Sequence, residues 1–173
     1  MAAPRPRRRD LPSLDGPRLA ARPAVPSDAA ALQACLDGAP EYFIRTEGAP
    51  AAPDHARRML ADAEADPARR IWLLAPPRGG PALGVLDLHL DQPGPADAHV
   101  GLLLFRESCQ GIGYGGETVA TLVHALAEAG YHAVRATVGD ENPEARDFWE
   151  HEGFAEVGRL EGGVTVLERI LGV

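Results

Sequence analysis

Glycine-rich residues at positions 110–116 are the part of the sequence that points most directly to chemistry. The segment reads Gln110, Gly111, Ile112, Gly113, Tyr114, Gly115 and Gly116. It follows an almost wholly apolar segment, 99–105, and precedes one whose apolar residues recur at helical spacing. At such a junction, backbone N–H groups can approach a phosphate closely, and the helix N-terminus adds partial positive charge. Because so many glycines exceed what a turn needs, we expect a phosphate-binding loop.

Two other phosphate-binding motifs share features with this loop. Gly111, Gly113 and Gly116 satisfy the G-x-G-x-x-G dinucleotide fingerprint, and Asp140 follows downstream. That fingerprint directly follows its strand, whereas residues 106–110 intervene here, and too little chain remains for a second half-sheet. A Walker loop needs a lysine, and the sequence contains none. A dinucleotide-binding oxidoreductase is therefore the weaker alternative, and the pyrophosphate end of coenzyme A is the remaining common ligand.

Residues 142–154 form a second informative segment. Asn142 followed by Pro143 is typical of a helix start, with Asn as N-cap and Pro at the first helical position. The helix would present an alanine and an aromatic pair together and end at a glycine: Ala145, Phe148, Trp149 and Gly153.

Together the two segments resemble the GCN5-related N-acetyltransferase (GNAT) family. Residues 110–115 are similar to its Q/R-x-x-G-x-G/A signature, and residues 142–154 to its later N-x-x-A segment with an aromatic pair and a terminal Gly-Phe. The likeness extends in element order over 18–170. It implies a GNAT-like mixed α/β (α+β) fold with a central splayed sheet, and transfer of an acetyl group from acetyl-CoA to a primary amine.

The resemblance also implies where the cofactor, acetyl-CoA, lies. The backbone of residues 103–105 would pair with the pantetheine arm like an added strand, and the amides of 111–116 would hold the pyrophosphate. Asn142 and Phe148 would contact the arm from the other side. The implied cofactor-binding residues are Leu103, Leu104, Phe105, Gln110, Gly111, Ile112, Gly113, Tyr114, Gly115, Gly116, Asn142, Phe148 and Trp149.

The family transfers its acyl group directly within a ternary complex. A neutral amine attacks the thioester, a backbone N–H meets the oxyanion, and the thiolate leaves. No covalent enzyme intermediate is needed, so we interpret Cys109 as incidental. Many relatives place a tyrosine at the position of Trp149 to protonate the thiolate. Because an indole N–H is a hydrogen-bond donor and not a practical acid, the general acid stays open here.

A general base must remove the proton of the acceptor ammonium. The candidates beside the central strands are His99, His89, Asp87, Glu107 and Glu41. A histidine titrates in the useful pH range, which favours His99. Glu41, with Tyr42 and Phe43, is better suited to shaping the acceptor pocket. The pairs His124/Glu128 and His151/Glu152 fall on polar helix faces and are interpreted as solvated surface.

The remaining pattern supplies the elements that must position these residues. We expect about seven strands, at 18–24, 71–75, 83–90, 99–105, 132–138, 154–160 and 164–170. About four helices are expected: one capped by Ser27, one capped by Asp54, one after the glycine loop and one after Asn142. Residues 40–50 are expected to form a loop. In 83–90, the alternation places Leu86, Leu88 and Leu90 on one face.

Composition sets the class of protein. A chain of 173 residues with 45% hydrophobic content predicts one globular domain, placed at 17–173, after a disordered tail, 1–16, rich in proline and arginine. No apolar stretch suits a membrane helix or a secretory signal, so we expect a cytoplasmic protein without membrane contact. Cys35 and Cys109 are too few for a disulfide framework, and no metal site is indicated.

The net charge of −8 bears on partners. It argues against a nucleic-acid ligand, because such proteins need a basic face for phosphates. It slightly favours a cationic small-molecule amine as acceptor. Dimers are frequent in families of this kind, so a homodimer stays open. The principal alternative function is a non-catalytic acyl-CoA-binding or regulatory module, which the tryptophan at 149 and the lack of a firm base would suit.

Overall fold

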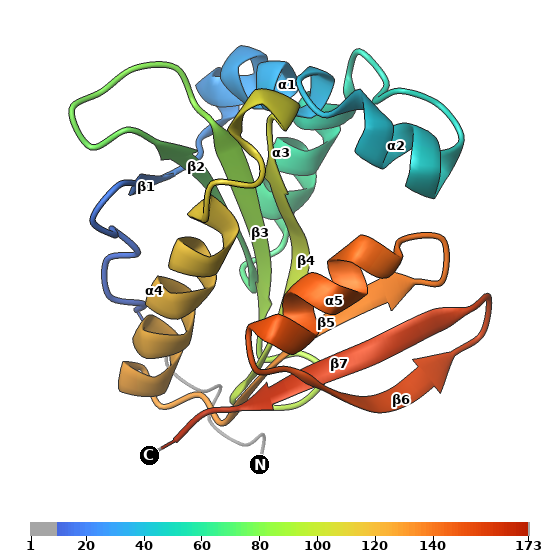
Figure 1. The fold of residues 1–173 in the computed structure, drawn as a ribbon. Helices are drawn as coiled ribbons and strands as arrows, with labels where there is room; N and C mark the ends of the chain where they lie inside the picture. Colours follow the sequence, from blue (N-terminus) through green and yellow to red (C-terminus); the bar gives the residue numbers. More distant parts are fainter. Residues whose placement is uncertain (1–9, 173) are drawn as a thin grey trace.

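The computed structural model describes residues 10–172, which form one seven-stranded mixed sheet (Figure 1). Its strands are β1 (Ala20–Pro23), β2 (Arg69–Ala75), β3 (Gly84–Leu90), β4 (Asp97–Phe105), β5 (Ala133–Gly139), β6 (Ala155–Leu160) and β7 (Val164–Ile170). Their spatial order is β1-β2-β3-β4-β5-β7-β6. Every neighbouring pair is antiparallel except β4 and β5, which are parallel. The predicted mixed α/β class with seven strands is confirmed.

The helices differ from the prediction at two places. The structure has α1 (Ala29–Asp37), α2 (Pro40–Glu47), α3 (His55–Ala65), α4 (Tyr114–Glu128) and α5 (Pro143–His151), with short 3-10 turns η1 (Pro26–Asp28) and η2 (Glu107–Cys109). The expected loop over 40–50 is therefore wrong, because α2 occupies most of it. Ser27 is not the N-cap of α1, since it lies inside η1, and Asp28 precedes the helix.

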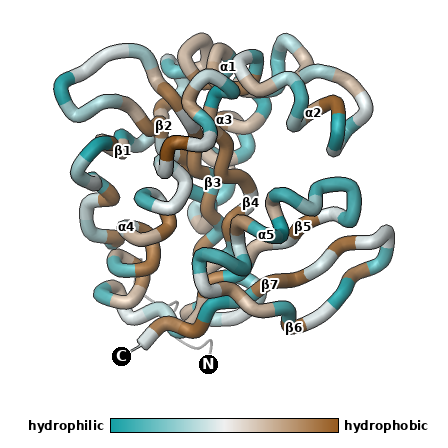
Figure 2. The backbone as a smooth tube through the Cα atoms, in the orientation of Figure 1, coloured by the Kyte–Doolittle hydropathy of each residue, from teal (hydrophilic) through white to brown (hydrophobic). Residues whose placement is uncertain are grey.

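Both faces of the sheet are covered by helices, which divide the core in two. Leu86, Leu88 and Leu90 pack with α4 and α5, whereas Val85 packs with α1, α2 and α3. The alternation predicted for residues 83–90 is therefore confirmed. Figure 2 shows the result as a hydrophobic band along β3 and β4 between the two helical layers.

The sheet splits between its two parallel strands. β4 pairs with β5 only over Asp97–Val100, opposite residues 133–136. Beyond that point β4 continues along β3, and β5 continues along β7. A β-bulge marks the divergence, because Leu88 pairs with Val100 and Asp87 with Leu102, leaving Gly101 as the extra residue. Within residues 10–172, the backbone edge of 101–105 that faces β5 consequently has no strand beside it, as the predicted splayed sheet requires.

The first described residues lie against the sheet. Leu14 is 5% exposed and belongs to the core on the α4 side, and the Asp15 Oδ1 atom accepts a hydrogen bond from the Ala21 N–H at 2.8 Å. Residues 10–16, expected in the tail, thus pack on the domain, while positions 1–9 of that prediction fall outside the described residues. Among residues 10–172, no helix has the length and apolar character needed to cross a membrane.

Candidate functional site

A cleft of about 500 Å³ lies beside the split in the sheet. Its walls come from α2, the open edge of β4, the glycine loop and the facing ends of α4 and α5, which Figure 1 shows around the split. Of the residues that we predicted to bind the cofactor, eleven line it: Leu103, Leu104, Phe105, Gln110, Gly111, Gly113, Tyr114, Gly115, Gly116, Asn142 and Phe148. The structure therefore brings together residues from both sequence motifs.

The two remaining predicted residues, Ile112 and Trp149, are not part of the cleft wall. Ile112 is 53% exposed at the tip of the loop. Trp149 is 7% exposed and packs edge-on against Phe148 and Phe154, with ring centroids 5.1 Å and 4.8 Å away. Because successive helical residues point about 100° apart, Phe148 reaches the cleft while Trp149 turns to the core.

The glycine loop is tied to the end of β4 and has two left-handed glycines. The Gln110 Nε2 atom donates a hydrogen bond to the Phe105 carbonyl oxygen at 2.8 Å. Gly111 and Gly113 have φ values of 76° and 91°, in the region that side chains rarely adopt. Helix α4 begins directly afterwards at Tyr114, so its unpaired amides face the cleft end of the loop.

Gly115 and Gly116, which line the cleft, also determine how closely two helices can approach. They lie in the first turn of α4 rather than in the loop. A β-carbon on Gly115 would lie 3.0 Å from the Phe148 ring, and one on Gly116 would lie 3.0 Å from the Glu152 Oε1 atom. The absence of side chains here allows α5 to approach α4. The resulting narrow cradle of amides is suited to an extended ligand with an anionic end.

Asn142 combines a structural role with a place in the cleft wall. Its Oδ1 atom accepts a hydrogen bond from the Ala145 N–H at 3.2 Å, which confirms the predicted N-cap of α5. The same oxygen accepts from the Arg45 Nη1 atom at 3.2 Å. Because the oxygen is engaged twice, the amide nitrogen is the group that Asn142 can offer to a ligand.

Helix α2 forms the cleft wall opposite α5. Its Arg45 crosses to α5, where its Nη1 atom lies 3.4 Å from Glu144 Oε2 as well as close to Asn142. Tyr42 also lines the cleft, and burial raises the pKa of its hydroxyl. Arg45 is not among the predicted site residues, because the pattern of residues 40–50 predicts a loop.

Two glutamates predicted as candidate bases, Glu41 and Glu107, both line the cleft and are joined by a hydrogen bond. The Glu107 Oε1 atom accepts a hydrogen bond from the Glu41 backbone N–H at 2.9 Å, in the first turn of α2. The Glu107 N–H in turn donates to the Gly38 carbonyl oxygen at 2.8 Å. Glu107 thereby joins the segment before the glycine loop to the start of α2.

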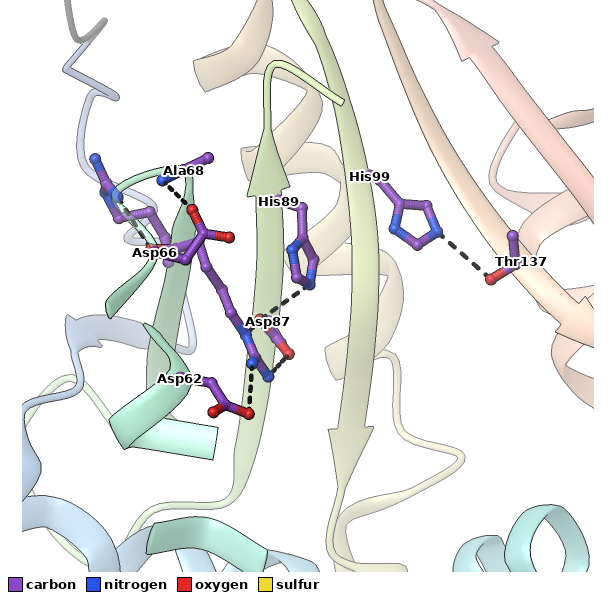
Figure 3. A network of polar contacts seen from close by, with 9 residues as sticks. Asp62, Asp66, Ala68, Asp87, His89, His99 and Thr137 are labelled. Atoms are coloured by element: carbon purple, nitrogen blue, oxygen red, sulfur yellow. Dashed lines mark hydrogen bonds and ion pairs between the residues drawn. The ribbon is translucent and has the colours of Figure 1, made fainter. Parts of the chain in front are cut away.

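His99, the favoured base candidate, lies at the fork between β4 and β5 instead of in the cleft wall (Figure 3). Its Nε2 atom is 3.4 Å from Thr137 Oγ1 on β5, and its ring centroid is 6.1 Å from that of His89 on β3. The adjacent Gly101 is exposed, and a β-carbon there would lie 3.0 Å from His89 Nε2. The His89 ring thus occupies the space that a side chain at Gly101 would take, while Gly101 itself is open to solvent.

Charged groups surround the histidine pair. Asp87, 4% exposed, accepts two hydrogen bonds from Arg69, at 3.0 Å and 2.7 Å, and lies 3.8 Å from His89 (Figure 3). Both carboxylate oxygens of Asp87 are therefore engaged by Arg69. Beyond it, Arg69 also contacts Asp62 of α3, and Arg135 of β5 pairs with Glu168 of β7. Burial lowers the pKa of His99, and the nearby His89 and Arg135 lower it further against the opposing charge of Asp87.

Two residues that we interpreted as solvated surface belong to the cleft. His151 and Glu152, at the end of α5, both line it. Gly116, next to Glu152, carries no side chain, which is the feature that could have indicated the position of Glu152. Among residues 10–172, no group of three or more His, Cys, Asp or Glu side chains could hold a metal ion.

Comparison with known proteins gives the same identification as the two motifs. The sequence matches the family model of the acetyltransferase (GNAT) domain over residues 18–155. An acetyltransferase from Thermus thermophilus is 32% identical, with a TM-score of 0.83 over 89% of this chain and 97% of that one.

Two further structures share the fold at lower identity. A probable GNAT-family acetyltransferase from Chromobacterium violaceum has 17% identity and a TM-score of 0.80 over 91% of this chain and 85% of its own. Spermidine N-acetyltransferase from Vibrio cholerae, solved with CoA and spermine, has 17% identity and a TM-score of 0.70 over 89% and 96%. The fold, the split sheet and the matches over most of the chain establish that this protein belongs to the GNAT family of acetyltransferases.

Proposed function

We propose that this protein transfers an acetyl group from acetyl-CoA to a primary amine of a small molecule, in a ternary complex. The observation that carries the proposal is the continuity of the cleft. It runs from the unpaired edge of β4 to the amides at the start of α4 without a break. An extended ligand with an apolar arm and a phosphate end matches this arrangement, and a compact or wholly apolar ligand does not.

Different residues of the chain would bind different parts of this ligand. The open backbone edge of residues 103–105 would pair with the arm, and the loop amides around Gly113 would take the pyrophosphate. Phe148 would pack against the arm, and the Asn142 amide nitrogen would donate to it. Bound acetyl-CoA supplies the activated acyl group. Because the arm would run from the loop toward Gly101, its acyl end would lie near the strand fork.

His99 is the residue that we assign to accept the acceptor's proton. Its lowered pKa keeps the imidazole neutral at physiological pH, and a neutral imidazole can take a proton from an ammonium group. Trp149 is buried and offers no acid to the departing thiolate. This last feature also favours the second candidate, a module that binds acyl-CoA without turning it over.

The acceptor proposal rests on charge. Among the residues that the structure describes, four glutamates line the cleft, at positions 41, 107, 144 and 152, against one arginine, Arg45. The net charge of the whole chain is −8. Spermine is the amine bound in the Vibrio cholerae structure. We therefore expect a small cationic amine to be preferred.

Thermal unfolding with acetyl-CoA tests cofactor binding. At a hundredfold excess over Kd, we expect the midpoint to rise by about 5–10 °C, because the ligand binds only the folded chain. Gly113→Ala should lose this shift, since a side chain at φ 91° strains the loop. Gly79→Ala is the matched control: φ is 89° at Gly79, in the β2–β3 connection, and its ligand-induced shift should persist.

Thiol release separates the two candidate functions. Acceptor-dependent release of CoA across a panel of amines would support the transferase. A saturating thermal shift with no release for any amine would favour the binding module. No shift at saturating acetyl-CoA would contradict both.

A further inference from the structure

The phosphate end of the cleft is short of positive charge. No arginine or lysine occurs between Arg106 and Arg135, a stretch that contains the whole glycine loop and α4. The Arg106 side chain itself is directed elsewhere, because its Nε atom donates to the Ala82 carbonyl oxygen at 2.8 Å. The glutamates of the cleft wall add negative charge. Backbone amides alone would have to hold a ligand end that carries several negative charges.

Arg18, distant in sequence, supplies a cation at this place. Its Nη1 atom donates to the Ile112 carbonyl oxygen at 2.9 Å, and its guanidinium carbon lies 4.8 Å from the centroid of the Tyr114 ring. The Nη2 atom lies 3.1 Å from where a β-carbon on Gly113 would be. The guanidinium thus lies against the left-handed residue of the loop. The Arg18 side chain is 48% exposed, so a ligand can reach it.

Glu117, in the first turn of α4, keeps Arg18 in this position. Its Oε1 atom accepts a hydrogen bond from the Arg18 backbone N–H at 3.1 Å and lies 3.5 Å from the Arg18 Nε atom. The Oε2 atom is buried without a hydrogen-bond partner among the described residues. A carboxylate at a helix N-terminus opposes anion binding there, and Arg18 offsets its charge.

We propose that Arg18 binds a phosphate group of the cofactor, from the outer side of the glycine loop, opposite the loop amides that face the cleft. The inference rests on the proposed function. A guanidinium suits phosphate oxygens because its planar donors can form paired, charge-assisted hydrogen bonds. The Nε atom is held by Glu117 and the Nη1 atom by the loop, so Nη2, beside Gly113, is the group we assign to the phosphate.

Calorimetric binding of CoA to an Arg18→Gln variant is the direct test. We expect affinity to fall about tenfold or more, the usual worth of a charge-assisted hydrogen bond. Arg22→Gln is the matched control. It makes the same charge change four positions along the chain, where Arg22 pairs with Asp28, and it should alter CoA affinity less than about twofold. Unchanged CoA affinity in Arg18→Gln would overturn the proposal.

Two truncated ligands locate the phosphate and exclude a purely structural role. If dephospho-CoA loses as much affinity as CoA, Arg18 meets the pyrophosphate; if only CoA loses affinity, Arg18 meets the 3′-phosphate. Either result supports the proposal. Acetyl-pantetheine carries no phosphate, so an equal loss for this ligand would show that Arg18 only shapes the loop. Failure of the wild-type protein to bind CoA would instead count against the proposed function.

The neighbouring carboxylate gives an independent measurement. Glu117→Gln keeps an oxygen that can accept from the Arg18 N–H but removes the negative charge. We expect this variant to bind CoA more tightly than the wild type, and the gain should vanish in 1 M salt, where screening acts over about 3 Å. Weaker binding in Glu117→Gln would contradict an electrostatic role for the pair.

Discussion

At the level of single residues, acyl transfer depends on one proton, which the acceptor ammonium must lose before its nitrogen can attack. We propose that His99 takes it, since His99 lies near the exposed bulge residue Gly101 and at the fork where the acyl end of the ligand would lie. A histidine whose pKa is lowered is neutral above that pKa and inactive as a base below it. Activity should therefore fall as the pH drops through the lowered pKa of His99.

Substitution of His99 tests this assignment. His99→Gln should lower kcat/KM by about a hundredfold, the usual contribution of a general base, while CoA affinity is preserved. The variant His89→Gln tests the pH dependence of the rate instead of its magnitude. It removes the electrostatic influence of His89 that lowers the His99 pKa, so the acid limb of the pH–rate profile should move to higher pH. Full activity in His99→Gln, or an unmoved limb in His89→Gln, would argue against His99 as the base.

The roles of single residues were predictable from the sequence where a local backbone conformation requires a particular residue type. The two left-handed glycines, 111 and 113, and the Asn142 cap were expected because each meets a local backbone requirement. Arg18 was not expected, because its hydrogen bond to Ile112 depends on how the segment before β1 lies against the glycine loop and the start of α4. His151 and Glu152 were missed because the sequence pattern of a polar helix face is the same whether the face meets solvent or lines a cleft.

At the level of elements, local signals found every strand and every helix but one. Helix α2 was missed because Ala39, at its N-cap, makes no side-chain hydrogen bond, and because Pro40 and Gly48 are residue types that are typical of loops. Its first turn is completed instead by Glu107, sixty-six positions away in sequence. A helix of eight residues is marginal alone, so tertiary contacts of this kind decide whether it forms.

The role of Glu107 can be tested by its hydrogen bond. Glu107→Ala should cost about 1 kcal/mol of stability and raise the KM of the amine, because α2 loses its cap. Glu107→Gln keeps an acceptor oxygen for the Glu41 N–H and should restore most of both. Denaturant unfolding and steady-state kinetics measure the two effects. If Glu107 were a catalytic base, Glu107→Gln would be as inactive as Glu107→Ala, which would contradict the capping role.

At the level of the whole molecule, the two ends of the cleft beside the split sheet would bind groups of opposite charge. In the proposed complex, the phosphate end of the ligand needs local positive charge, which the loop amides and Arg18 would provide. The rest of the cleft and the chain as a whole are acidic. A cationic acceptor would be drawn to such a surface, and its attraction would weaken as salt screens it.

The acceptor's charge should therefore appear in its KM. At low ionic strength, a diamine should have a KM several-fold below that of a monoamine of equal chain length, and the difference should disappear in 1 M salt, where the Debye length is about 3 Å. The variant Glu41→Gln/Glu144→Gln should raise the diamine KM, because both carboxylates line the cleft. Glu128→Gln, an exposed glutamate at the far end of α4, is the control and should change it little. A KM that is equal for the two amines at every salt concentration would show that the acidic cleft does not select its acceptor by charge.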